Sequence, residues 1–140
     1  MDKKIKHLEM IENVIQRMAT NSFQLKGWAL TLVSLIGTLA GAGKDKRFII
    51  LAFIPIVAFW FLDSFYLQLE RKYKALYKNV AAMDEDKIDF NMDTRDIEFP
   101  TTEEAERICY CRCLFSRTEW PFYILICAAM VVVIYILKVF

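Results

Sequence analysis

The stretch GWALTLVSLIGTLAGAG, at residues 27–43, carries no charged side chain and decides the class of fold. Two more apolar runs follow it, FIILAFIPIVAFWFL at 48–62 and PFYILICAAMVVVIYIL at 121–137. Each run is close to the roughly 20 residues with which an α-helix crosses a hydrocarbon layer of about 30 Å. We therefore expect an all-α membrane protein with three transmembrane helices.

Composition supports the same class of protein. The chain has 140 residues, of which 56% are hydrophobic and 25% are charged, so the apolar and charged residues must be segregated along it. This length allows one functional unit beside several spans. The net charge of +1 argues against a strongly basic protein that binds a nucleic acid polymer.

The order of the segments predicts a hairpin and a separate C-terminal span. The polar turn at 43–47 is short, so the first two spans form an antiparallel helical hairpin. We expect an amphipathic membrane-surface helix at 1–22, the transmembrane hairpin with a cytoplasmic helical extension at 23–79, a cytoplasmic segment at 80–118 and the third transmembrane helix at 119–140.

The distribution of positive charge predicts the orientation. Of the 18 Lys and Arg residues, five precede the first span and nine lie between the second and third spans, which makes 14. The other four lie on the opposite side in a three-span arrangement. Because positive residues concentrate on the cytoplasmic side, the N-terminus is expected inside and the C-terminus outside.

The N-terminal segment has the period of an amphipathic helix. Apolar residues recur at Ile5, Leu8, Ile11 and Met18, with polar residues between them. This stripe lies either on the inner leaflet or against the protein's own cytoplasmic segment. The single histidine, His7, is expected to be a solvated surface residue.

Small and polar residues follow one face of the first span, at alternating steps of four and three residues. This stripe contains Thr20, Gln24, Gly27, Thr31, Ser34, Thr38 and Gly41. Gly37 and Gly41 form a GxxxG pair, which permits close approach of another helix in lipid. Three roles remain open: helix packing within one copy, an interface between copies in a homo-oligomer, and a water-exposed pore wall.

Asp63 lies near the inner end of the second span. A carboxylate at membrane depth is costly and usually has a partner or a wet cavity. Lys26 on the first span is a candidate partner, and the alternative is that Asp63 reaches the headgroups by itself. With the stripe, Asp63 completes the predicted pore or helix interface.

A basic and aromatic cluster follows the second span. It consists of Arg71, Lys72, Tyr73, Lys74, Tyr77 and Lys78. Such a cluster is typical of a helix that binds lipid headgroups, and it also offers charge pairing and ring stacking to a nucleotide.

The segment at 83–100 is acidic and lacks a helical period. Ile88, Phe90 and Met92 alternate with polar residues, which predicts either a short strand or an ordered loop. A last helix is expected to begin with Thr101 as its N-cap and to continue into the third span, with a bend near Pro121.

No set of residues predicts catalysis, a metal site or a cofactor. Cys109, Cys111 and Cys113 do not converge on a helix. The acidic residues at 84, 86 and 89 lack the glycine and final glutamate of a calcium-binding EF-hand. With one histidine, no catalytic triad can be assembled. We expect a protein that is not an enzyme.

Two segments resemble a known group of proteins. IQRMATNSFQLKGWALTLVSLIG at 15–37 and FWFLDSFYLQLERKYKALYKNV at 59–80 are similar to small bacterial multi-span membrane effectors that accompany antiviral nucleotide-signalling systems. The resemblance implies an inner-membrane effector that a soluble signalling enzyme, or its nucleotide product, triggers. Our first hypothesis is therefore a membrane effector that oligomerises through its spans and disrupts or depolarises the membrane when it is triggered.

Two other functions remain as alternatives. One is a membrane anchor or scaffold that docks a soluble partner protein through residues 80–120. The other is a small ion-coupled transporter, which the stripe and Asp63 favour.

Overall fold

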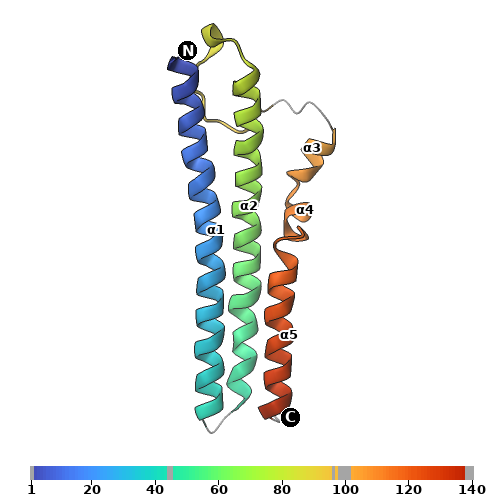
Figure 1. The fold of residues 1–140 in the computed structure, drawn as a ribbon. Coiled ribbons are helices and arrows are strands. Elements are labelled where there is room, and N and C mark those ends of the chain that lie inside the picture. Colours follow the sequence, from blue (N-terminus) through green and yellow to red (C-terminus); the bar gives the residue numbers. More distant parts are fainter. Residues whose placement is uncertain (1, 44–45, 96, 98–101, 138–140) are drawn as a thin grey trace. The chain divides into compact units, whose positions relative to one another are not determined.

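A computed structural model describes residues 2–43, 46–95, 97 and 102–137, and within them the chain is all-helical, with no strand (Figure 1). Two helices are long and apolar enough to cross a membrane, Asp2–Ala42 and Arg47–Ala82, and the second of them begins with a 3₁₀ segment. The elements in order are α1 (Asp2–Ala42), the 3₁₀-helix η1 (Lys46–Ala52), α2 (Phe53–Ala82), the 3₁₀-helix η2 (Glu85–Lys87), α3 (Thr102–Arg107), α4 (Tyr110–Leu114) and α5 (Trp120–Leu137).

The chain divides into two units, and α1 and α2 each contribute to both. Unit 1 contains Met1–Ser22 and Phe65–Cys113, and unit 2 contains Phe23–Ser64 and Leu114–Phe140. Each unit has its own hydrophobic core. They are described in turn.

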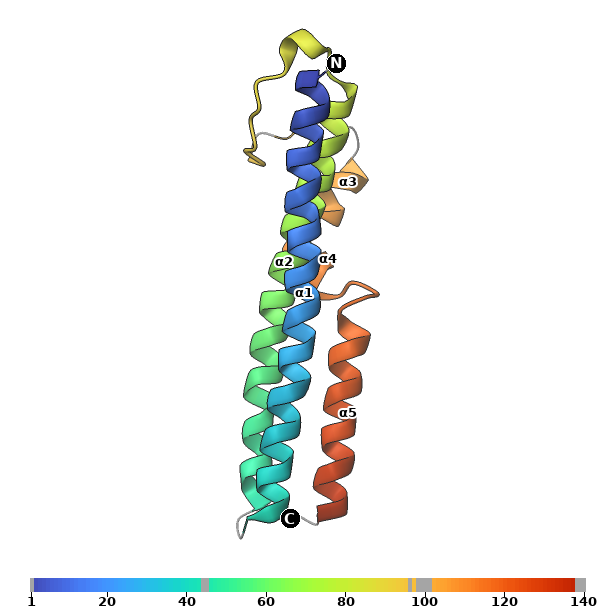
Figure 2. The ribbon, with the colours of Figure 1, turned by 60° about the vertical axis from the view of Figure 1, so that its left-hand side comes forward.

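Unit 2 holds the three apolar helices. The later part of α1, the early part of α2 and α5 run side by side in both views of the ribbon (Figure 2). Their core consists of Ala29, Val33, Ala40, Ile49, Ala52, Ile56, Tyr123, Ile126 and Met130. Small residues at 29, 40 and 52 allow the helix backbones to approach closely. The apolar part of α5 spans Trp120–Ile136.

Prolines mark the starts of two helices. Pro55 lies in the first turn of α2, and Pro121 is the second residue of α5. A proline there costs no helical hydrogen bond, because the first N–H groups of a helix have no intrahelical partner.

The expectation of one last helix that continues into the third span is wrong, because α3, α4 and α5 are separate helices. Its predicted N-cap, Thr101, lies outside the described residues.

The N-terminal stripe packs within the chain. Ile11 is fully buried in the core of unit 1 with Leu76, Val80 and Ile97, and Leu8 packs against them. Two positions were expected for this apolar stripe, on the inner leaflet or against another segment of the chain. In the structure the stripe packs against another segment of the chain. Residues 2–22 are also no separate helix, because α1 has no proline or turn before Ala42 and continues into unit 2.

The expectation of a solvated His7 is wrong. Its side chain is 1% exposed, and its Nε2 atom lies 3.1 Å from the carbonyl oxygen of Asn91, to which it donates. The imidazole also packs on the ring of Phe90, at 5.4 Å between centroids. The loop that contains these two residues covers the histidine, which residue spacing alone does not reveal.

The alternating segment after η2 is an ordered loop, and the predicted strand does not form. Asp89, Asn91 and Asp93 each accept a hydrogen bond from the backbone N–H two residues later, at 2.9–3.0 Å. These Asx turns satisfy the backbone locally and compete with strand pairing. Phe90 adopts a positive φ of 56° between two of them. Arg95 donates to the Asp93 carboxylate, and this contact lowers the pKa of the Asp93 carboxyl group to about 2.

Side chains of α2 hold the short helices of unit 1. Gln68 donates to the carbonyl oxygen of Ile108 at 3.0 Å, and Arg71 donates to that of Arg107 at 2.6 Å. The C-terminal carbonyl groups of a helix otherwise have no partner. These bonds therefore stabilise the interruption between α3 and α4.

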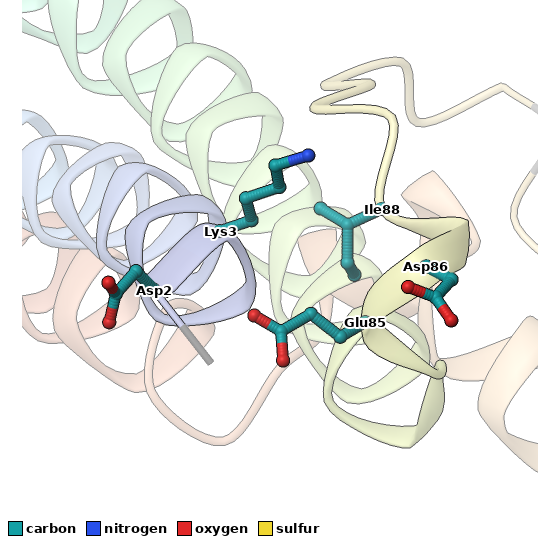
Figure 3. A pocket seen from close by; sticks show the side chains of 5 residues that line it. All are labelled: Asp2, Lys3, Glu85, Asp86 and Ile88. Carbon is teal, nitrogen blue, oxygen red and sulfur yellow. The ribbon is translucent and has the colours of Figure 1, made fainter.

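An open hollow lies beside the first turn of α1. It has a volume of about 510 Å³ and is lined by Asp2, Lys3, Glu85, Asp86 and Ile88 (Figure 3). Its four charged residues are exposed, as expected for an open depression of the surface.

The core of unit 1 predicts a difference between two isoleucines of α1. Ile11→Ala removes a fully buried side chain and should reduce the stability of unit 1 by about 2–5 kcal/mol. Ile5→Ala, at a side chain that is 48% exposed, is the matched control. Hydrogen–deuterium exchange of the amides at 76–80 should accelerate in the Ile11 variant alone. Equal exchange in the two variants would show that this core is not formed.

Candidate functional site

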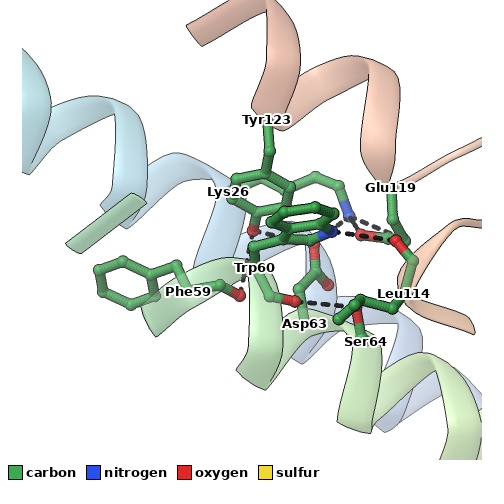
Figure 4. Close-up of polar contacts among 8 residues, drawn as sticks. All are labelled: Lys26, Phe59, Trp60, Asp63, Ser64, Leu114, Glu119 and Tyr123. Atoms are coloured by element: carbon green, nitrogen blue, oxygen red, sulfur yellow. Dashed lines mark hydrogen bonds and ion pairs between the residues drawn. The ribbon is translucent and has the colours of Figure 1, made fainter. Parts of the chain in front are cut away.

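Four side chains of unit 2 form a buried polar site, here called the charge cluster: Lys26, Asp63, Glu119 and Tyr123 (Figure 4). The Nζ atom of Lys26 lies 2.6 Å from Oδ2 of Asp63, and 3.1 and 3.0 Å from the two carboxyl oxygens of Glu119. The hydroxyl of Tyr123 lies 3.1 Å from Oδ2 of Asp63. One ammonium group thus joins two carboxyl groups from different helical segments.

The charge cluster is almost closed to solvent. Asp63 is 0% exposed, Glu119 2% and Lys26 18%. Removing ionised groups from water costs several kcal/mol for each ion, so such groups persist only when they are paired and hydrogen-bonded. The cluster meets this condition because Lys26 contacts both carboxyl groups and Tyr123 donates to one of them.

The local structure explains how each side chain reaches the site. Lys26 lies on the core face of α1, one turn before Ala29, and Asp63 lies two turns after the buried Ile56 on α2. Glu119 directly precedes α5, and Tyr123 follows it by one turn. Lys26, Asp63 and Glu119 therefore meet where the three helices pack.

A second layer fixes the positions of these groups. The indole of Trp60 stacks on the Tyr123 ring at 6.3 Å, and its N–H donates to the carbonyl oxygen of Leu114 at 3.0 Å. The hydroxyl of Ser64 donates to the Trp60 carbonyl oxygen at 2.8 Å. Phe115 meets the Trp60 indole edge to face. These contacts hold the turn before α5 against α2.

All three tryptophans lie close to the charge cluster along the chain. Trp28, Trp60 and Trp120 are each within three residues of Lys26, Asp63 or Glu119. On the other side of the cluster α5 continues for 18 residues, which is about 27 Å at a rise of ~1.5 Å per residue. The cluster thus lies at one end of the apolar length of unit 2.

The sequence identified part of this site. The structure pairs Asp63 with Lys26, its candidate partner, and Asp63 does not reach solvent by itself. Glu119 and Tyr123 were missed. The sequence signal for Glu119 was its position directly before an apolar run. This position indicates a contact with Lys26 only when α5 is aligned with α1 and α2.

The stripe of small and polar residues on α1 faces away from the other helices of unit 2. Thr31, Ser34, Thr38 and Gly41 are exposed, whereas Ala29, on the core face, is buried. The hydroxyls of Thr31 and Thr38 donate to carbonyl oxygens one turn earlier in the same helix, at 2.9 and 2.8 Å.

The glycines of the stripe have open space beside them. Among the residues that the structure describes, no atom beyond the local helix lies within 4 Å of a Cβ built at Gly27, Gly37 or Gly41. Packing against the described helices of the same copy therefore does not account for these glycines. The roles that remain are an interface between copies and a pore wall.

The basic and aromatic cluster of unit 1 mostly serves the chain itself. Arg71 is bonded to the Arg107 carbonyl, Lys74 pairs with Glu70, and Lys78 lies 2.8 Å from Glu104. Tyr73 and Tyr77 pack against the core of unit 1. The remaining cation of the cluster, Lys72, is half-buried. Arg71, Lys74 and Lys78 thus have separate partners within the chain.

The three neighbouring cysteines differ in their surroundings. Cys109 and Cys111 are exposed, whereas Cys113 is buried. The sulfur of Cys113 lies 3.6 Å from a guanidinium nitrogen of Arg71. Within the described part of the chain, no group of three His, Cys, Asp or Glu side chains is arranged to hold a metal ion.

Comparisons with protein families, with curated proteins and with solved structures find no match to this chain.

The charge cluster predicts unequal effects of one substitution at two lysines. Lys26→Met leaves two buried carboxyl groups without their cation and should reduce the stability of unit 2 by about 3–5 kcal/mol. Lys74→Met breaks a pair whose lysine is 56% exposed and should cost less than about 1 kcal/mol. Thermal unfolding in mild detergent measures both effects. If both variants unfold at the same temperature, the charge cluster does not hold unit 2 together.

Proposed function

We propose that this chain is a three-span protein of the bacterial inner membrane that assembles with further copies of itself through the stripe of α1 and makes the membrane permeable to ions when it is triggered. The observation that carries this proposal is the direction of the stripe. Its hydroxyls and glycines face away from the chain's own helices, where a second copy has access to them.

Membrane insertion is supported by the outer surface of unit 2. Its large apolar side chains are widely exposed, among them Trp28 at 67%, Leu39 at 64% and Leu125 at 70%. In water such a surface would be an aggregation hazard, whereas lipid covers it at no cost. Two helices have the length and apolar character of spans, and α5 extends beside them for about 27 Å as the third.

The charge cluster and the tryptophans set the position of the membrane boundary. Tryptophan rings favour the headgroup level, and buried ionic groups are tolerated best near the membrane surface. We therefore place the cluster at the cytoplasmic boundary, with the apolar length of the three helices below it. Unit 1 contains 12 of the 18 Lys and Arg residues, which is consistent with a cytoplasmic location for this unit.

The stripe supports self-association in lipid. Glycines allow two helix backbones to come close, and this contact is favourable because helices in lipid associate through packing and hydrogen bonds. Thr31 and Thr38 already donate to their own helix, so the face carries no unpaired donor at these residues before it associates. In a ring of copies, the same hydroxyl oxygens offer acceptors to water and to cations.

The trigger belongs to the same proposal. The resemblance of 15–37 and 59–80 to effectors of antiviral nucleotide signalling implies a soluble signalling enzyme as partner. Unit 1 is the candidate docking part, and its lysines and Arg71 also lie where lipid headgroups are expected.

The geometry gives less support to the two alternatives. The scaffold hypothesis relied on a strand that pairs with a partner, and residues 88–95 form Asx turns instead. The transporter hypothesis needs a carboxylate that binds a coupling ion, and Asp63 is occupied by Lys26 and Tyr123.

Enlarging the glycines of the stripe should abolish assembly. Gly37→Leu combined with Gly41→Leu adds bulk at two positions where a Cβ meets no described atom of the chain within 4 Å beyond the local helix, so a single copy should still fold. We expect the oligomer in detergent to fall to the monomer and ion leakage from liposomes to decrease at least tenfold. Ala128→Leu combined with Ala129→Leu adds comparable bulk to exposed positions of α5 and is the matched control. Unchanged oligomer size and leakage in the glycine variant would refute the interface.

The orientation has its own test. In a variant without the four native cysteines, a cysteine at position 46 should react with a membrane-impermeant thiol reagent in intact spheroplasts. The short turn of the hairpin faces outward in our proposal, because 14 positive residues lie on the other side. Labelling only after the membrane is disrupted would invert the orientation.

A further inference from the structure

The charge cluster is not balanced in charge when every group is ionised. Its ion pairs contain one cation, Lys26, and two carboxyl groups, Asp63 and Glu119. The remaining titratable group, Tyr123 of α5, is a neutral phenol that donates to Asp63. With both carboxyl groups ionised, the cluster carries a net charge of −1.

A buried net charge is unfavourable at this place. Asp63 and Glu119 are the buried carboxyl groups of the described chain, at 0% and 2% exposure. An uncompensated carboxylate in such surroundings is avoided by protonation or by a further counter-charge.

The meeting of the two acids at one atom points to a proton. Oδ2 of Asp63 and both carboxyl oxygens of Glu119 lie 2.6–3.1 Å from the same Nζ atom of Lys26. Two ionised carboxylates are acceptors only and repel each other, whereas a carboxylic acid donates to a carboxylate. One proton on the pair removes this repulsion.

We propose that the charge cluster is a proton-binding site, in which Asp63 and Glu119 share one proton and together with Lys26 form a neutral group. The inference depends on the geometry of the cluster and stands whether or not the chain permeabilises membranes.

The direction of the pH effect follows from the charges. At neutral and lower pH the shared proton keeps the cluster neutral, and Glu119 holds the start of α5 to Lys26 on α1. As the pH rises and the proton leaves, the cluster acquires a buried charge of −1. The attachment of α5 to α1 and α2 should therefore weaken with increasing pH.

Infrared spectroscopy detects the proton directly. Exposed Asp and Glu side chains are ionised at about pH 7, so the C=O stretch of a protonated carboxyl group at that pH reports a buried acid. The full chain in lipid nanodiscs should show this band. Glu119→Gln and Asp63→Asn each leave one carboxyl group beside Lys26 and should each lose the band. Glu103→Gln removes an exposed carboxyl group and should retain it. Absence of the band in the parent protein, or its persistence in both cluster variants, would overturn the proposal.

Stability against pH provides the second measurement. Between about pH 5 and about pH 8 the unfolding temperature of the parent should decrease, because over this range the folded chain holds a proton that the unfolded chain has lost. That of Glu119→Gln should change much less, because glutamine imitates the protonated acid in shape without titrating. Equal slopes in the two proteins would contradict the inference. The titration is repeated with sodium replaced by a large organic cation. If the stability follows sodium instead of pH, a metal ion balances the charge and the proton site is refuted.

Discussion

The contact of one ammonium group with two carboxyl groups is the constraint on which unit 2 depends. Lys26 belongs to α1, Asp63 to α2, and Glu119 to the turn before α5, so a single set of ion pairs fixes three segments at one level. Below this level the helices present mainly apolar side chains to one another and to the exterior. The polar cluster therefore sets the register, and the apolar packing follows from it.

The two faces of α1 have different tasks. The core face uses small apolar residues such as Ala29 and Ala40, which allow α2 and α5 to pack closely. The opposite face uses glycines and hydroxyls, and none of the described helices of unit 2 covers it at Gly37 or Gly41. Elsewhere on its surface α1 exposes larger apolar side chains such as Trp28 and Leu39, which suit lipid, and a helix that only anchored the chain would be expected to carry such side chains on this face too. This asymmetry is the physical reason to propose a second copy as the partner of α1.

The elements that could be predicted are those governed by strong and local energetic terms. Uninterrupted apolar runs of span length identified the helices of unit 2, and the cost of a charge at membrane depth singled out Asp63 and its partner Lys26. What escaped prediction depends on contacts between distant residues. His7 is buried because a loop more than 80 residues later covers it, and Glu119 matters only once α5 is aligned with α1 and α2.

Local competition explains the errors in the region between α2 and α5. The alternation around Phe90 resembles a strand, but the same Asp and Asn residues bind backbone N–H groups two positions later and stabilise turns. The break between α3 and α4 is stabilised by Gln68 and Arg71 of α2, which a helical period cannot show.

The membrane position of the charge cluster can be measured with the three native tryptophans, one on each helix of unit 2. Their fluorescence in liposomes is recorded with lipids that are brominated at different depths along the acyl chain. Our account predicts that Trp28, Trp60 and Trp120, studied in variants that retain one tryptophan each, are all quenched most strongly by bromines near the headgroups. Strongest quenching by the deepest bromines, or no quenching by any lipid, would contradict a cluster at the membrane boundary.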